Sequence, residues 1–216
     1  MKNKNRIIIA LDKISIKESL KIARDVTGLV WGFKINDLLF EDMKIIPWLK
    51  KFGRVFADVK LYDIPNTVSN SVKKLSIAGA DMITVHASGG IEMMKAAKKS
   101  AGRSKILAVT ILTSKHSDLR ELVRLTRNAL EGGVDGVVCS GLSLSAINRI
   151  PGTKSLLKVV PGIRPKWYKR KDDQKQTITP RAAVQSGAQF LVIGRPILNA
   201  DNPSKTVKKI LEEMVE

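Results

Sequence analysis

The sequence predicts an α/β fold, a (β/α)8 TIM barrel that forms a single domain over residues 1–216. Eight apolar, β-branched runs alternate strictly with eight amphipathic stretches along the chain. Polar residues or glycines follow almost every apolar run, as expected where one end of a barrel carries a site. The alternative is an open doubly wound sheet, which typically has fewer strands and a glycine-rich turn after the first one. This chain has ALDKIS at that turn, which favours the barrel.

The predicted strands are nearly continuous apolar runs, the pattern of parallel strands that are buried on both faces. They span residues 6–11, 29–35, 54–61, 82–87, 105–112, 136–141, 156–162 and 190–197. The predicted helices span 17–27, 37–51, 66–79, 90–100, 117–131, 142–149, 180–187 and 203–215. Two helix starts are indicated by SDLRE at 117–121 and by Thr179 before Pro180, because a short polar side chain caps a first turn and proline fits inside it.

Composition bounds the partners and the location of the protein. Its 38 Lys and Arg against 20 Asp and Glu give a net charge of +18, which attracts nucleic acid, an anionic membrane surface or a phosphorylated metabolite. No window approaches the length of a membrane span, and the apolar run near the N-terminus ends at Asp12, too early for a signal peptide. Cys139 is the single cysteine, so we expect a core thiol in a protein of the reducing cytoplasm.

The carboxyl ends of the predicted strands gather the polar side chains, and active sites of TIM barrels lie at those ends. The residues found there are Asp12, Lys34, Asp58, Lys60, His86, Thr113, Ser114, Ser140, Pro161, Gly162, Arg164, Gly194 and Arg195. A functional site at this end of the barrel is therefore expected.

A charged array is predicted at the end of the third strand. Asp58 and Lys60 are two residues apart and point to one face, and Lys34 can reach them from the neighbouring strand. A structural interpretation is open: Asp63 could cap the helix after Pro65, and Asp58 with Lys60 could be an ion pair at the rim. The combination with Lys34 and Asp12 favours function, because lysines interleaved with carboxylates on adjacent strand ends are hard to justify as stabilisation. A lysine flanked by two carboxylates is expected to stay protonated. Such a lysine is a positioned proton donor, suited to protonating a developing carbanion.

Other chemistries find no support in the sequence. The two histidines, His86 and His116, do not stand at a metal-ligand spacing, and no serine has the G-x-S-x-G context of a nucleophile. We therefore expect no metal and no cofactor. His86 is interpreted as a core or supporting histidine.

An anion site is predicted after the last two strands. Gly194 lets the backbone approach a phosphate closely, and Arg195 offers a two-pronged guanidinium, with Arg164 on the preceding loop. That loop, at about 163–178, is long for its position and is interpreted as a phosphate-binding lid in which Gln174 makes a contact. Its KWYKRK segment would also suit stacking on a nucleic-acid strand, but one short cluster makes a small footprint, so nucleic acid is the less favoured partner.

The segment DVKLYDIPNT at 58–67 resembles the signature of the orotidine 5′-monophosphate decarboxylase family. The resemblance extends over the whole chain in family order, through ALD, FKI, TVHASGG, AVTILTS, PGIR, DDQ and GRPI. It implies metal-independent decarboxylation of orotidine 5′-monophosphate to uridine 5′-monophosphate in de novo pyrimidine biosynthesis, without a cofactor. A related magnesium-dependent decarboxylase of 3-keto-gulonate 6-phosphate shares D-x-K-x-x-D, but IPNT favours the orotidylate enzyme. A basic nucleic-acid-binding protein that kept the barrel is the non-enzymatic alternative.

The resemblance also implies a role for individual residues. Lys60 would protonate the C6 carbanion, Asp58 would lie beside the leaving carboxylate, and Lys34 and Asp63 would complete the charged network. Asp63 would enter the site from the partner subunit of a homodimer together with Thr67. The substrate contacts implied by the resemblance and by the strand ends are Asp12 and Lys34 for the ribose, Thr113 and Ser114 for the pyrimidine, and Pro161, Gly162, Arg164, Gln174, Gly194 and Arg195 around the phosphate.

Overall fold

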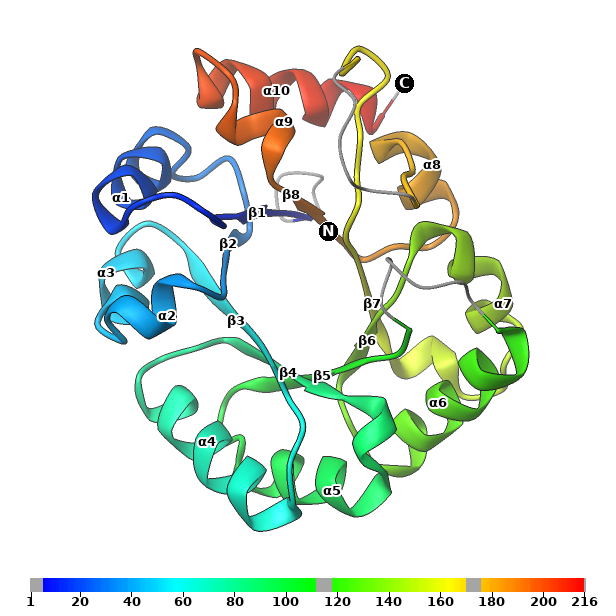
Figure 1. Cartoon of the computed structure of the whole chain (residues 1–216). Coiled ribbons are helices and arrows are strands. Elements are labelled where there is room, and N and C mark those ends of the chain that lie inside the picture. Colours follow the sequence, from blue (N-terminus) through cyan, green and yellow to red (C-terminus); the bar gives the residue numbers. More distant parts are fainter. Residues whose placement is uncertain (1–5, 112–117, 170–175, 216) are drawn as a thin grey trace.

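The computed structural model describes residues 6–111, 118–169 and 176–215, in which eight parallel strands close into a barrel in the order β1 to β8 (Figure 1). The strands are β1 (Ile7–Ala10), β2 (Gly32–Ile35), β3 (Arg54–Leu61), β4 (Met82–His86), β5 (Lys105–Val109), β6 (Gly136–Val138), β7 (Leu157–Val160) and β8 (Phe190–Ile193). The predicted TIM barrel is confirmed, and each strand pairs with its sequence neighbour, with β1 closing on β8.

Helices surround the barrel on its outside (Figure 1). They are α1 (Ile16–Asp25), α2 (Leu38–Glu41), α3 (Ile45–Lys50), α4 (Pro65–Ile77), α5 (Ile91–Ser100), α6 (Leu119–Glu131), α7 (Leu144–Asn148), α8 (Pro180–Gln185), α9 (Arg195–Leu198) and α10 (Pro203–Glu213). Short 3-10 turns lie at η2 (Ala87–Gly89), η3 (Gly141–Ser143) and η4 (Thr153–Ser155). The caps predicted from sequence are confirmed: Asp118 accepts from the Arg120 amide and Thr179 from the Ala182 amide.

Several predicted elements are shorter in the structure than expected, and the two largest departures are a divided helix and a shortened strand. The single helix expected over 37–51 is divided into α2 and α3, because Asp42 is extended and its side chain accepts from the Lys44 amide. The division places Pro47 in the first turn of α3, where its missing N–H costs nothing. The strand expected over 190–197 ends at Ile193, and α9 begins at Arg195.

Apolar side chains form two layers on either side of the sheet. Alternate strand residues fill the inside of the barrel, among them Ile8, Phe56, Leu107 and Val159. Their neighbours pack outward against the helices in a larger core. Since both faces of the sheet are apolar, the charged side chains of the strands are confined to the barrel ends.

Among the helices in the described ranges, none has the length and apolar character of a membrane-spanning helix.

Candidate active site

The centre of the site is an irregularity in β3. Ala57 pairs with Ile83 and Leu61 with Val85, so four steps along β3 match only two steps along β4. The additional residues bulge, and Lys60 adopts a left-handed backbone with φ of 50°. A non-glycine residue in this conformation is strained, and such strain concentrates at functional sites. The bulge therefore presents Asp58 and Lys60 together at the carboxyl end of the barrel.

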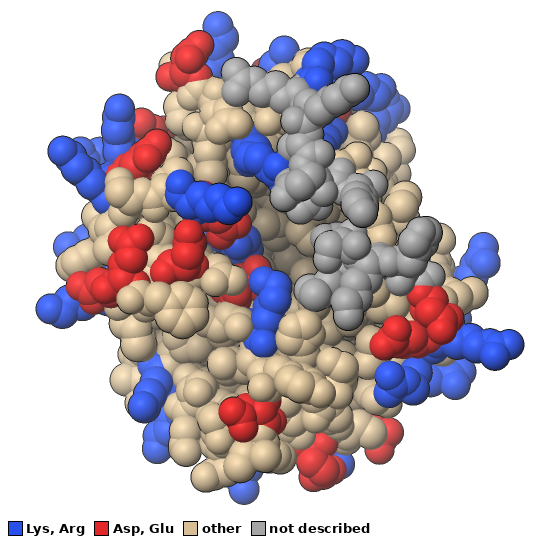
Figure 2. Space-filling view, viewed as in Figure 1, with Lys and Arg blue, Asp and Glu red and all other residues tan. Residues whose placement is uncertain are grey.

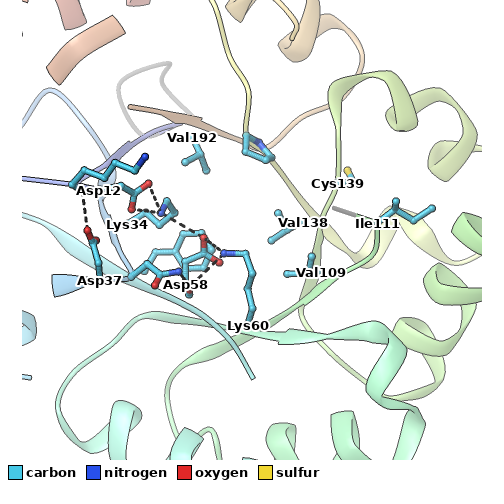
Figure 3. A pocket seen from close by; sticks show the side chains of 14 residues that line it. Asp12, Lys34, Asp37, Asp58, Lys60, Val109, Ile111, Val138, Cys139 and Val192 are labelled. Atoms are coloured by element: carbon cyan, nitrogen blue, oxygen red, sulfur yellow. Dashed lines mark hydrogen bonds and ion pairs between the residues drawn. The ribbon is translucent and has the colours of Figure 1, made fainter. Parts of the chain in front are cut away.

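Four charged side chains from three strand ends form one connected array (Figure 3). The Lys34 ammonium lies 2.6 Å from an Asp12 carboxylate oxygen and 3.5 Å from Asp58 Oδ2. Lys60 approaches Asp58 from the other side, with its Nζ 2.8 Å from the same Oδ2. The sequence-predicted grouping of Asp12, Lys34, Asp58 and Lys60 is thus what the fold brings together.

Asp58 is held ionised in a buried position, with only 10% of its side chain exposed. Burial alone would raise the pKa of Asp58, but the charges of Lys34 and Lys60 and hydrogen bonds from Lys60 and Thr84 outweigh it and lower the pKa. The Asp58 carboxylate lies between two ammoniums, so the site holds fixed charges of both signs. Fixed charges of this kind stabilise charge that develops in a reaction.

A cavity of about 460 Å³ opens beside the array and has two unlike walls. The charged residues lie on one wall, while Val109, Ile111, Val138 and Cys139 lie across from them (Figure 3). Burial raises the pKa of the Cys139 thiol to about 12, so Cys139 contributes a neutral surface. The cavity therefore offers charge on one wall and apolar surface on the other.

A second cavity of about 250 Å³ adjoins the first, and Asp12, Lys34 and Pro161 are among the residues that line both. Gly162, Arg164, Gly194 and Arg195 line the second cavity and not the first. Figure 2 shows the hollow near the middle of this face, with Lys and Arg side chains at its edge. Arginine guanidiniums and a backbone glycine at one cavity make a suitable anion site.

The loop that carries Arg164 is closed at its base by a short bridge. The Arg164 amide donates to the Ile178 carbonyl at 2.9 Å, and the Ile178 amide donates back to Gly162 at 3.3 Å. Beyond the bridge, Trp167 packs under the Lys209 ammonium, 4.6 Å from the ring centroid. Arg164 is therefore positioned by ordered backbone on both sides of the loop.

Some predicted site residues lie elsewhere or outside the described residues. Asp63 and Thr67 are exposed and are not among the residues lining the two cavities. The Asp63 carboxylate accepts from the adjacent Ile64 amide at 2.6 Å, while α4 has no side-chain cap, so the proposed helix cap is wrong. Ser140 bonds Ser143, and His86 packs edge-on against the Tyr62 ring. The predicted site residues Thr113, Ser114 and Gln174 lie outside the described residues, as does His116, which was not predicted to belong to the site.

Three polar residues that line the cavities were not predicted from the sequence. Asn36 donates its side-chain amide to the Asp58 carbonyl at 2.9 Å, and Asp37 accepts from the Lys13 amide at 2.9 Å. Lys13 has a left-handed backbone with φ of 61° and lines both cavities. The signal for Asn36 and Asp37 was available, because both directly follow the strand that carries Lys34. Nothing in the sequence indicates that the backbone of Lys13 is left-handed.

Comparison with known proteins gives one consistent result over nearly the whole chain. The family described as Orotidine 5'-phosphate decarboxylase / HUMPS family matches residues 5–210. A protein named orotidine 5'-phosphate decarboxylase from Maridesulfovibrio salexigens is 37% identical over 230 residues, covering 97% of this chain and 99% of that protein. One of the same name from Streptococcus gordonii is 43% identical over 222 residues, covering 92% of this chain and 93% of that protein.

Solved structures agree with the sequence comparison. A crystal structure of orotidine 5'-phosphate decarboxylase from Lactobacillus acidophilus is similar with a TM-score of 0.82 and 31% identity. The similarity covers 98% of this chain and 99% of that one. The corresponding enzyme structure from Pyrococcus horikoshii also has a TM-score of 0.82, at 28% identity, over 97% of this chain and 99% of that one.

Proposed function

We propose that this chain, which belongs to the orotidine 5'-phosphate decarboxylase / HUMPS family, converts orotidine 5′-monophosphate to uridine 5′-monophosphate in pyrimidine biosynthesis. The observation that carries the proposal is the array of Lys34, Asp58 and Lys60 at the edge of a cavity with an apolar far wall. A pyrimidine ring can lie along the apolar wall while its carboxylate meets the charged one. The enzyme is a carboxy-lyase, in keeping with the names of its relatives.

In the proposed reaction, the bond between C6 and the carboxylate breaks and its electron pair stays on C6 as carbon dioxide leaves. The Lys60 ammonium then gives C6 a proton, and Lys60 later regains a proton from water. The 2.8 Å contact with Asp58 Oδ2 holds the Lys60 ammonium at the edge of the cavity. About a third of the Lys60 side chain is exposed, at 32%, so its ammonium can reach a molecule in the cavity.

We propose that the reaction needs no metal, since the array supplies the charge that a metal would otherwise supply. Asp12 and Asp58 both already pair with Lys34, which supports this proposal. The ammoniums lie close to where negative charge develops, and they are held there before the substrate arrives. Preorganised charge of this kind lowers a barrier without reorganisation during the reaction.

Binding of the nucleotide's remaining parts is assigned to the two cavities. Asp12 and Lys34 lie where the cavities adjoin and are proposed to hold the ribose hydroxyls. The second cavity is proposed to take the phosphate, with Pro161, Gly162, Arg164, Gly194 and Arg195 around it. The proposed further contacts are Thr113 and Ser114 to the pyrimidine and Gln174 to the phosphate from the 163–178 lid. Binding energy gained at the phosphate can be expressed in the transition state.

We further propose a homodimer in which Asp63 and Thr67 of one subunit complete the site of the other. The exposure of Tyr62 and Ile64 on either side of Asp63, at 64% and 66%, supports this proposal, because large apolar side chains are seldom left in water beside a site. Sedimentation of the purified protein measures its mass in solution. A stable monomer that is fully active would contradict the shared site.

We also propose that the protein is located in a reducing cytoplasm, which fits the lone buried Cys139.

The experiment that tests the function is incubation of the protein with orotidine 5′-monophosphate, with and without EDTA. Loss of the substrate's ultraviolet absorbance reports decarboxylation. We expect turnover that EDTA leaves unchanged. Turnover that EDTA abolishes would retain the activity and overturn metal independence, whereas no turnover by the folded protein would overturn the proposed function itself.

A further inference from the structure

Thr84 occupies the gap that the β3 bulge opens in the ladder between β3 and β4. It lies between Ile83 and Val85, which pair with Ala57 and Leu61 on either side of the bulge. Its side chain is fully buried, at 0% exposure, and it does not line the substrate cavities. A buried hydroxyl at this position needs hydrogen-bond partners.

Both partners of the Thr84 hydroxyl belong to the charged array. The backbone N–H of Lys60 donates to Thr84 Oγ1 at 2.8 Å. Thr84 Oγ1 donates in turn to Asp58 Oδ1 at 3.0 Å. The hydroxyl therefore connects the strained backbone of one charged residue with the carboxylate of the other.

The first bond compensates for the bulge. In a regular parallel ladder, the N–H of Lys60 would donate to a carbonyl of the neighbouring strand, but the register shift removes that arrangement. The Thr84 hydroxyl replaces the carbonyl as acceptor. It thereby stabilises the left-handed backbone conformation of Lys60, which is strained because this residue is not a glycine.

The second bond orients the Asp58 carboxylate. With Oδ1 engaged by Thr84, Oδ2 points to Lys60 at 2.8 Å and to Lys34 at 3.5 Å. Asn36 fixes the backbone carbonyl of the same residue. The Asp58 carboxylate is thus held by Lys34 on β2, Lys60 on β3 and Thr84 on β4. Of these three partners, Thr84 is the uncharged one.

We propose that Thr84 is a positioning residue of the site: its hydroxyl fixes the backbone of Lys60 and the rotation of the Asp58 carboxylate, and so places the proton donor. This inference rests on the proposed function of Lys60. It predicts that loss of the hydroxyl impairs the chemical step while leaving substrate binding nearly intact, because Thr84 does not line either cavity.

The test compares Thr84→Val, Thr84→Ser and the control Thr126→Val. Valine matches threonine in shape but neither accepts from Lys60 nor donates to Asp58, whereas serine keeps the hydroxyl. Thr126 is an equally buried threonine at 0% exposure, whose hydroxyl donates to the Leu122 carbonyl of the same helix, α6, at 2.8 Å. For Thr84→Val we expect kcat to fall roughly 10- to 100-fold with KM within about threefold, from the usual cost of unpaired buried groups. Thr84→Ser restores most of kcat, and Thr126→Val keeps it.

A second readout separates positioning from general loss of stability. The groups facing Asp58 are Lys34 from β2, Lys60 on β3 and Thr84 from β4, with Asp12 of the β1 end acting through Lys34. A hydrogen bond to the carboxylate favours its charged form, so its removal raises the pKa of Asp58. The acid limb of kcat in Thr84→Val therefore moves to higher pH, and the Asp58 carboxyl signal in a carbon-13 NMR titration moves with it.

The NMR titration needs no substrate, so it distinguishes the two proposals. If wild type fails to decarboxylate orotidine 5′-monophosphate, the proposed function fails, while a raised Asp58 titration in Thr84→Val still supports the positioning. Unchanged kcat, pH profile and titration in that variant would overturn the role of Thr84. A loss of kcat equal to that of Thr126→Val would overturn it too. Should Thr84→Val not fold, Thr84→Cys replaces it, with a thiol that bonds weakly and a fall in kcat in the same direction.

Discussion

The two ends of the barrel carry the same kinds of charged residue and use them differently. At the amino end, Asp81 bonds the Lys50 ammonium at 2.7 Å and the Val55 amide at 2.8 Å. Asp135 repeats this arrangement with the Lys98 ammonium at 2.6 Å and the Ile106 amide at 2.8 Å. Each carboxylate thus joins one helix to the start of the neighbouring strand. These ion pairs hold the outer layer to the barrel.

At the carboxyl end, the charged side chains bond mainly to one another. Asp58 meets two ammoniums, and the backbone that carries Lys60 is strained. The array lies beside a cavity, whereas the Asp81 and Asp135 pairs use their carboxylates to satisfy backbone amides. An ion pair that completes backbone hydrogen bonding serves stability. One that concentrates charge at a cavity, at the cost of strain, indicates function.

The largest expected difference between the two ends concerns their lysines. Lys60→Ala removes the proposed proton donor, and we expect kcat for orotidine 5′-monophosphate to fall by roughly 10²- to 10⁴-fold. Binding of a nucleotide analogue, measured by calorimetry, stays nearly unchanged. Lys50→Ala, the matched control, removes an ion-paired lysine at the other end and keeps kcat. Retained turnover in Lys60→Ala would exclude Lys60 as the donor.

The next effect separates the two cavities at the carboxyl end. Arg195→Ala removes a guanidinium from the proposed phosphate site, and we expect KM to rise roughly 10- to 100-fold, the usual value of a charged hydrogen bond. Arg124→Ala is the control, because its side chain is 61% exposed and lies 3.9 Å from Glu121 on α6. Steady-state kinetics measures both variants. If Arg195→Ala left kcat and KM unchanged, the phosphate assignment would be wrong.

A smaller effect is expected at the amino end, on stability alone. Asp81→Asn keeps an oxygen for the Val55 amide but loses the charge that attracts Lys50. We expect the free energy of unfolding to fall by about 1 kcal/mol, since the pair is partly exposed. Urea unfolding followed by circular dichroism measures it. A loss of several kcal/mol would contradict the modest stabilisation that we assign to this partly exposed ion pair.

The smallest effect is the dependence of stability on pH through Asp58. Its pKa is lower in the folded protein than the ordinary value of 3.8, so the folded state favours the ionised form. That contribution is fully present above pH 3.8 and is lost as the pH falls through the lower, folded pKa. Compared with wild type, Asp58→Asn should lose less stability over this acid range in urea unfolding. Identical acid profiles would contradict the depressed pKa.

The barrel and the core of the site were predictable because both follow from short-range patterns. Apolar alternation gives eight strands, and polar residues at their ends locate Asp12, Lys34, Asp58 and Lys60. The division of the helix at Asp42 also had a signal, since Pro47 would have interrupted the longer helix. Element ends were less predictable, as in the strand expected to continue to residue 197.

The roles of Thr84 and Lys13 were not predictable, because each depends on contacts between separate elements. In the sequence, Thr84 resembles any other strand residue. Its role depends on the register shift between β3 and β4, which brings its hydroxyl to the Lys60 amide. A left-handed lysine has no local sequence signal, in contrast to glycine. The carboxylate and amide contacts at the amino end of the barrel could have been predicted from three similar triplets, at 79–81, 133–135 and 187–189. Each starts with a left-handed glycine and ends on Asp or Gln, whose side chain accepts a neighbouring strand's amide.

The most direct test of the contrast between the two ends is kcat for orotidine 5′-monophosphate in Asp58→Asn and Asp81→Asn, measured side by side. Both variants remove one carboxylate charge that pairs with lysine, and they differ in which end of the barrel loses it. We expect kcat of Asp58→Asn to fall by roughly a hundredfold or more, as when one preorganised charge is lost, and kcat of Asp81→Asn to stay within about twofold of wild type. Equal losses in the two variants would contradict the assignment of catalysis to the carboxyl end and of stability to the amino end.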